Sequence, residues 1–169
     1  LLVTGLDVTI VGYFRFSAVG YYSVAAMLIT FVAGSSGSML NALMTPVAAL
    51  HALRETDRIR KIVFSATRLT MLLNALLTMT VFLWGAPLLR LWVGPVYASD
   101  ALPILKILVV AQTIRLTVSP YAVMLLSVGE QGKGAGAAIC EALLNLFASI
   151  GGAILLGPIG VAWGTLIGA

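Results

Sequence analysis

Residues 16–53 read FSAVGYYSVAAMLITFVAGSSGSMLNALMTPVAALHAL and contain no Asp, Glu, Lys or Arg, so that His51 is their one titratable side chain. About 20 apolar residues suffice for a helix to cross the hydrocarbon core of a bilayer. At about 1.5 Å per residue, a helix over the whole segment would overshoot a core about 30 Å thick, and both of its ends must lie in the interfaces. The segment predicts a membrane-spanning helix. The small residues GSSGS at 34–38 could instead divide it into two crossings, but each half would then be shorter than a crossing needs, so a single crossing is favoured.

The composition of the whole chain agrees with a membrane protein. Of its 169 residues, 60% are hydrophobic and 9% are charged, and its mean hydropathy is +1.07. Soluble domains have about 45–50% apolar and about 25% charged residues, and disordered chains are poorer still in apolar residues. Segments that alternate with period two, which are typical of membrane β-barrels, are not found. We therefore predict an all-α, polytopic transmembrane helix bundle.

Charges and Gly/Pro clusters divide the chain into about six helical spans. The chain begins at Leu1 and stops at Ala169 within an apolar run, so we interpret it as a fragment whose first and last spans are truncated. The predicted spans are 1–15, 21–50, 62–84, 102–128, 135–156 and 161–169.

The basic residues between these spans predict the orientation of the bundle. Five of them fall on one side of the membrane, and Arg15 and Arg90 fall on the other. The positive-inside rule places the side with five in the cytoplasm. They are Arg54, Arg58, Arg60, Lys61 and Lys133. Aromatic residues that favour the interface then fall on the outer side: Trp84, Trp92, Tyr97, Trp163, Tyr13, Tyr21 and Tyr22. Two crossings in 16–53 would change the charge count to six against one, so charge alone leaves that alternative open.

Catalytic and metal-binding motifs are missing from the sequence. It contains no HExxH, no GxSxG, no phosphate-binding glycine loop and, with Cys140 alone, no multi-cysteine metal site. The lone His51 is interpreted as an interfacial residue and not as a catalytic base. The net charge of +4 is scattered along the chain, which argues against nucleic acid as a partner. We expect no enzyme, no cofactor and no metal.

Three charged residues lie deep within predicted spans, away from the span ends, where each costs at least ~2.5–3.5 kcal/mol unless it faces protein or water. They are Arg68, Arg115 and Glu141, and their depths are close enough for contact. Polar residues share a helical face with two of them, because Gln112, Arg115 and Ser119 form one row and Glu141, Asn145 and Ser149 form another. Two arginines and one carboxylate leave a surplus positive charge.

Two interpretations of these residues remain open. Glu141 can pair with Arg68 or Arg115 to join helices, with the polar rows as packing contacts. Alternatively, the three line a net-cationic, water-filled path for an anionic substrate. Pro120 can kink its helix and act as a hinge. The third-span residues Thr67, Thr70, Asn74 and Thr78 are interpreted as packing residues, and Lys106 as a side chain that reaches the headgroups.

Several segments resemble one family in their order and spacing. Asp7 enters the first span, VGYYSVA follows at 19–25, Pro46 lies near the end of the second span, and LLRLWVGPVYASDALPILKIL occupies 88–108. The most specific segment is GEQGKGAGAAICEALLNLFASIGGAILLGPIGVAWGTLIGA at 129–169. Together they resemble the C-terminal half of Wzx-type O-antigen flippases, which belong to the multidrug/oligosaccharidyl-lipid/polysaccharide exporter superfamily.

The resemblance implies that residues 1–169 form the second lobe of a two-lobe transporter in the bacterial inner membrane. Its substrate would be an oligosaccharide on undecaprenyl pyrophosphate, moved by alternating access. Its partners would be membrane lipids, the missing N-terminal lobe and polysaccharide polymerase machinery. The expected substrate-binding residues are Arg68, Arg115, Gln112 and Asn145, the coupling or ion-pairing residues are Glu141 and Asp7, and the hinges are Pro120 and Pro46.

Three rival functions are weighed against this one. A drug/cation antiporter or a peptidoglycan lipid flippase belongs to the same superfamily, but a cation exporter would favour surplus acid where this sequence has surplus base. An intramembrane enzyme of glycan assembly should carry large outer loops, and the outer loops here are short. A membrane scaffold would leave the three buried charges with no purpose beyond pairing.

Overall fold

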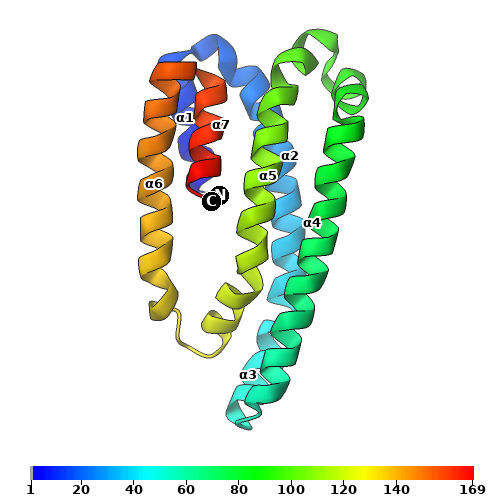
Figure 1. Cartoon of the computed structure of the whole chain (residues 1–169), viewed down its shortest axis with the longest axis vertical. Helices are drawn as coiled ribbons and strands as arrows, with labels where there is room; N and C mark the ends of the chain where they lie inside the picture. The colour runs from blue at the N-terminus through cyan, green and yellow to red at the C-terminus, as the bar shows by residue number, and fades with distance from the viewer. Residues whose placement is uncertain (1) are drawn as a thin grey trace.

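The computed structural model describes residues 2–169 and, within them, consists of helices without strands (Figure 1). The predicted all-α bundle is confirmed. Residue 1 of the first predicted span lies outside the described part. The elements are α1 (Leu2–Phe14), the short 3-10 helix η1 (Phe16–Ala18), α2 (Val19–Asn41), α3 (Met44–Ala52), α4 (Thr56–Val93), α5 (Pro95–Ser127), α6 (Gly132–Leu156) and α7 (Pro158–Ile167).

Among the described residues, four helical segments are long and apolar enough to cross a membrane. They are Phe16–Ala52, Thr56–Val93, Pro95–Ser127 and Gly132–Leu156, and the two shorter apolar helices are Gly5–Phe14 and Pro158–Ile167. Helix α2 continues without a break through the glycines and serines at 34–38. The chain bends later, between Asn41 and Met44, because Pro46 has no N–H to donate to the carbonyl of Ala42.

Helices α4 and α5 are longer than the predicted spans 62–84 and 102–128. The segment 85–101, which its charges and prolines marked as a loop, is helical on both sides of a single turn residue. That residue is Gly94, whose φ of 87° glycine adopts without steric cost. Pro95 then begins α5, because the fixed φ of proline suits the first turn of a helix. Arg90 and Asp100 are exposed and do not interrupt their helices.

The helices form two groups, with α1, α6 and α7 in one and α2, α3, α4 and α5 in the other (Figure 1). Close contact of α7 with α6 holds the first group together. A Cβ atom on Gly160 would collide with the backbone of Gly152, and one on Gly164 would collide with the backbone of Ser149. Glycines therefore let the two backbones approach closely, as is common between membrane helices.

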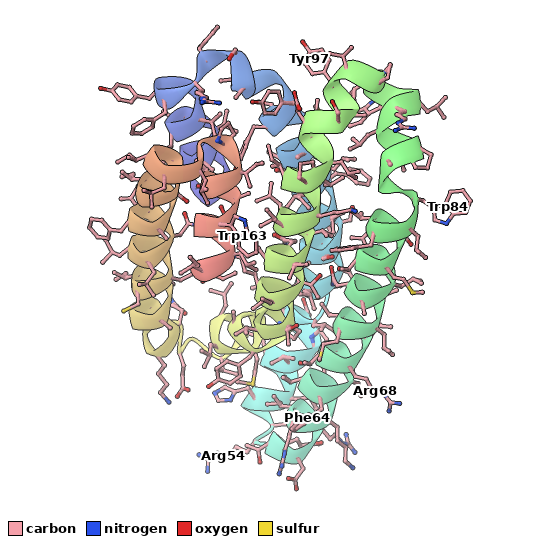
Figure 2. All side chains as sticks on the ribbon, turned by 45° about the horizontal axis from the view of Figure 1, so that its top comes forward. Arg54, Phe64, Arg68, Trp84, Tyr97 and Trp163 are labelled. Carbon is pink, nitrogen blue, oxygen red and sulfur yellow. The ribbon has the colours of Figure 1, made fainter. Side chains whose placement is uncertain are left out.

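Apolar side chains cover the outside of the bundle as well as its core. On α4, the buried residues include Thr70 and Asn74, whereas Leu72, Leu76 and Leu83 are exposed. This pattern is the reverse of a helix in water and fits a lipid-facing surface. Arg54 and Tyr97 lie at opposite ends of the molecule, as the predicted orientation requires, whereas Trp84 and Trp163 lie between these ends (Figure 2).

Candidate functional site

Asp7 on α1 is fully buried between α6 and α7. Its side chain is 1% exposed, and it accepts two hydrogen bonds from hydroxyl groups. Thr165 Oγ1 donates to Asp7 Oδ2 at 2.8 Å, and Ser149 Oγ donates to Asp7 Oδ1 at 3.2 Å. A buried carboxyl group is costly unless such partners satisfy it, so these three residues form one polar unit.

The close approach of α6 and α7 explains how the two hydroxyls reach one carboxyl group. Gly164 precedes Thr165 and lies against the backbone of Ser149, while Gly168 lies against Asn145, one turn away on α6. With side chains at these glycines, α7 would stand further from α6. The buried row Asn145 and Ser149, predicted from the spacing on one helix, thus faces α7 and α1.

Both hydroxyls have a second acceptor within reach, the carbonyl oxygen of Val161. It lies 3.2 Å from Thr165 Oγ1 and 3.4 Å from Ser149 Oγ. Each hydroxyl has one proton, which can be donated either to Asp7 or to this carbonyl. The unit can therefore adapt to a change in the charge of Asp7 by rotation of two O–H bonds.

Tyr22 on α2 adds a buried hydroxyl beside this unit. Its side chain is 1% exposed, and its hydroxyl has no hydrogen-bond partner among the described residues. A cavity of about 20 Å³ lies here, and its polar lining consists of Asp7, Tyr22, Gln112, Arg115 and Thr165. A volume of this size can hold one water molecule or one small ion.

Arg115 on α5 forms an ion pair with Glu141 on α6. The Arg115 Nε and Glu141 Oε1 atoms are 2.8 Å apart, and the two side chains are 31% and 35% exposed. The pair joins the two groups of helices, and both of its side chains remain partly exposed. A contact between Glu141 and Arg115, which the pairing interpretation requires, is present in the structure, and the alternative of a path for an anionic substrate stays a prediction.

A larger cavity of about 470 Å³ lies between α2 and α5. Gln112, Arg115 and Ser119 form its wall on α5, in the row predicted from their spacing. On α2 the wall includes Gly34 and Gly37, and a Cβ atom on either would meet no other atom within 4 Å. Arg115 and Gln112 line both cavities, so the polar cluster formed by Asp7, Tyr22, Gln112, Arg115, Glu141, Asn145, Ser149 and Thr165 is continuous with this space.

Arg68 is not brought to the polar cluster. It is exposed on α4 and extends away from the bundle (Figure 2), and it forms no ion pair with any described residue. The expectation that depth alone would allow all three charges to meet is wrong, because α4 turns this face outward. The cluster contains one guanidinium and two carboxyl groups, so the predicted surplus of positive charge is not found within it.

The remaining residues singled out from the sequence lie outside the polar cluster. Pro120 is buried in α5 next to Ser119, and Pro46 lies in the first turn of α3. Thr78 and Thr113 share a hydrogen bond of 2.8 Å between α4 and α5, which makes Thr78 a packing residue as expected. Lys106 lies over the ring of Phe82, at 5.2 Å from its centroid.

Four residues of the site and its cavities carry a weak signal or none in the sequence. Tyr22 was expected at the outer interface, and nothing in its surroundings along the chain marks it as buried. Thr165 falls within the segment that carries the family resemblance, but as a single threonine in an apolar run. Gly34 and Gly37 stand one turn apart on an apolar helix, and that spacing could have indicated a space beside α2.

Metal-binding groups and known relatives do not identify the site. Within residues 2–169, no three His, Cys, Asp or Glu side chains gather as a metal site would require. Comparisons with protein-family models, with curated proteins and with solved structures found no match to this chain.

Proposed function

We propose that this chain is part of a membrane transporter that moves a lipid-linked oligosaccharide by alternating access. The observation that carries the proposal is the 470 Å³ cavity with Arg115 and Gln112 in its wall, within a bundle whose helices are long and apolar enough to cross a membrane. Ionisable residues inside membrane helices are costly and commonly mark the path of a substrate or an ion. The family resemblance supplies the substrate class, a saccharide on undecaprenyl pyrophosphate.

Arg115 is the residue proposed to meet the diphosphate. A guanidinium has five N–H donors, and the contact with Glu141 uses the Nε atom, which leaves the terminal nitrogens for an anionic group. Because the ion pair is about one third exposed, the exchange of Glu141 for a phosphate oxygen does not require the bundle to open. Gln112, three residues earlier in the same wall, can donate to a sugar or phosphate oxygen.

Asp7 is the residue proposed to couple transport to a proton or a small cation. The carboxyl group is buried, and its two hydroxyl partners can turn to Val161 when the charge of Asp7 changes. The unpartnered hydroxyl of Tyr22 faces the same small cavity and could stabilise a guest there. Glu141 is less suited to this role, because it is paired with Arg115.

A second candidate is supported by the charges of the cluster. One guanidinium and two carboxyl groups leave a deficit of positive charge when both acids are ionised, which favours a cationic cargo. A drug/cation antiporter of the same superfamily is therefore the main alternative. The two proposals differ in what Arg115 does, since an anionic cargo needs this side chain and a cationic cargo is repelled by it.

The test replaces Arg115 in the full-length protein and measures surface polysaccharide together with protein abundance. We expect Arg115→Ala to abolish most export at normal abundance, and Arg115→Lys to retain part of it, because a lysine keeps the charge without the bidentate fork. Arg68→Ala is the matched control, since it removes the same charge from the outer face of α4 and should leave export unchanged. An Arg115→Cys variant should react with a water-soluble thiol reagent.

Normal export by Arg115→Ala would contradict the proposal. So would a collapse of abundance with an unreactive thiol, which is the result expected if Arg115 only supports the fold. If cells that carry Arg115→Ala become more resistant to cationic drugs while their surface polysaccharide is unchanged, the antiporter is favoured.

A further inference from the structure

A groove at the basic end of the molecule lies apart from the polar cluster. It has a volume of about 530 Å³ and runs between the last turn of α3, the first turns of α4 and the final turns of α5. No residue that lines it also lines the two cavities around Arg115. It therefore needs an explanation of its own.

The lining of this groove is most polar at its outer end; beyond Arg60, the polar residue that α4 adds to the lining is Thr67, whose hydroxyl donates to the carbonyl of Val63 in its own helix. Thr56 and Arg60 lie at its outer end, with His51 and Glu130 from the neighbouring segments. Val63 and Phe64 follow within the next turn of α4, and Met124 lines the groove from α5. Arg60 stands two residues before the predicted start of the third span, so the polar end lies at headgroup depth and the apolar part lies beside the acyl chains.

Arg60 has no carboxylate partner among the described residues and lies over the ring of Phe64, at 5.5 Å from its centroid. Glu130, the acid at the same end of the groove, is paired with Lys133 at 2.7 Å. Around this end, four basic residues (Arg54, Arg58, Arg60 and Lys61) stand against Glu55 and Asp57, a net charge of +2. The mouth of the groove is therefore positive, with one guanidinium left for a ligand.

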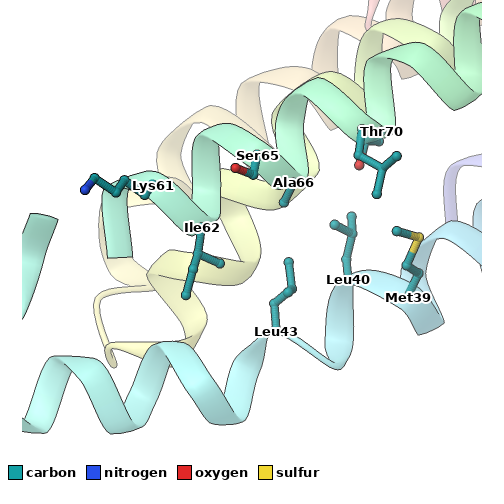
Figure 3. Close-up of a pocket in the computed structure, with 9 residues that line it drawn as sticks. Met39, Leu40, Leu43, Lys61, Ile62, Ser65, Ala66 and Thr70 are labelled. Atoms are coloured by element: carbon teal, nitrogen blue, oxygen red, sulfur yellow. The ribbon is translucent and has the colours of Figure 1, made fainter. Parts of the chain in front are cut away.

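We propose that this groove binds one anionic phospholipid, with its phosphate on Arg60 and an acyl chain along Val63, Phe64 and Met124. Basic pockets between membrane helices bind anionic headgroups in this way, and the apolar continuation favours a lipid over free phosphate. A second groove, between the end of α2, the turn at Leu43 and α4, differs because its lining is apolar apart from Ser65, Thr70 and a Lys61 side chain that extends away from it (Figure 3). The proposal does not rest on the transport function.

The test is native mass spectrometry of the full-length protein in detergent, titrated with phosphatidylglycerol or phosphatidylethanolamine. The unaltered protein should retain one phosphatidylglycerol more tightly than phosphatidylethanolamine. Arg60→Gln should weaken its retention about fivefold or more, the effect of about one basic residue beside an anionic lipid. Val63→Trp fills the apolar part and should also weaken it, with Arg60 still present.

Arg54→Gln is the matched control, because it removes the same charge from the same basic end but does not line the groove. Equal losses from Arg54→Gln and Arg60→Gln would mean diffuse attraction and would overturn the proposal. Equal retention of the two lipids would overturn it as well, as would displacement of the lipid by an equal concentration of glycerol phosphate. Surface polysaccharide is measured separately in cells with the Arg60→Gln protein, so that a failure of the lipid proposal can be distinguished from a failure of the transport proposal.

Discussion

Asp7 and Arg68 are both ionisable residues on apolar helices, yet their surroundings are opposite. Asp7 is enclosed by α1, α6 and α7 and accepts from two hydroxyls, whereas Arg68 projects from the bundle. Arg115 lies between these extremes, since it forms one ion pair and also lines a cavity. At this scale, neighbours on other helices decide what each charge can do.

Asp7→Asn is the residue-scale test of the coupling role. An asparagine has the same shape and a carbonyl oxygen that can accept from Thr165, so the protein should reach normal abundance. It has no charge to gain or lose, so export should fail. Polysaccharide display and abundance are measured together, and normal display would remove Asp7 from the coupling.

Thr165→Val is the companion variant, because it keeps the shape of the threonine and removes the donor to Asp7. The free energy of unfolding should fall by about 1.5–3 kcal/mol, the range for a hydrogen bond to a charged group. Thermal or denaturant unfolding of the purified full-length protein measures it. Thr80→Val serves as its control, since Thr80 is exposed and bonds only within its own helix.

At the scale of the element, the α6–α7 pair depends on glycines that face the other helix. Gly164→Ala should separate the two helices and lower the free energy of unfolding by about 1–3 kcal/mol, the usual cost of overpacking. Gly151→Ala on α6 is the control, because its Cβ atom would meet nothing within 4 Å. An alanine there should be neutral or slightly stabilising in a helix. Equal effects in thermal unfolding would contradict the close-contact explanation.

The sequence predicted the presence of the helices better than their ends. Long uncharged runs such as 16–53 need no tertiary information, because only a helix satisfies its backbone in lipid. The ends of α4 and α5 were missed, since Arg90 and Asp100 mark the edge of the hydrocarbon core and not the end of a helix. Beyond that edge, Gly94 alone is enough to reverse the chain.

The site was predicted within single helices and not across them. The row of Gln112, Arg115 and Ser119 follows from the helical repeat, and it does line one cavity. The rotation of each helix in the bundle is set by packing, which is why Arg68 was expected inside and is found outside. Tyr22 was missed for the same reason.

At the scale of the whole molecule, the basic end of the bundle predicts an orientation in the membrane. We expect residue 58 to face the cytoplasm and residue 97 to face the outside. Single cysteines at these positions, in a protein whose exposed Cys140 has been replaced, can be treated with an impermeant thiol reagent in intact cells. Position 97 should react and position 58 should be protected. The reverse pattern would overturn the orientation.

The backbone contact between α6 and α7 also has a consequence for leakage. Where Gly152 touches Gly160 and Gly164 touches Ser149, no water molecule fits between the two helices. Asp7, directly behind this contact, is insulated on that side, and the small cavity beside Tyr22 and Arg115 offers an ion or proton an approach from the other side. If Asp7 couples transport as proposed, this one-sided seal would let the carboxyl group exchange its charge without opening a continuous leak across the membrane.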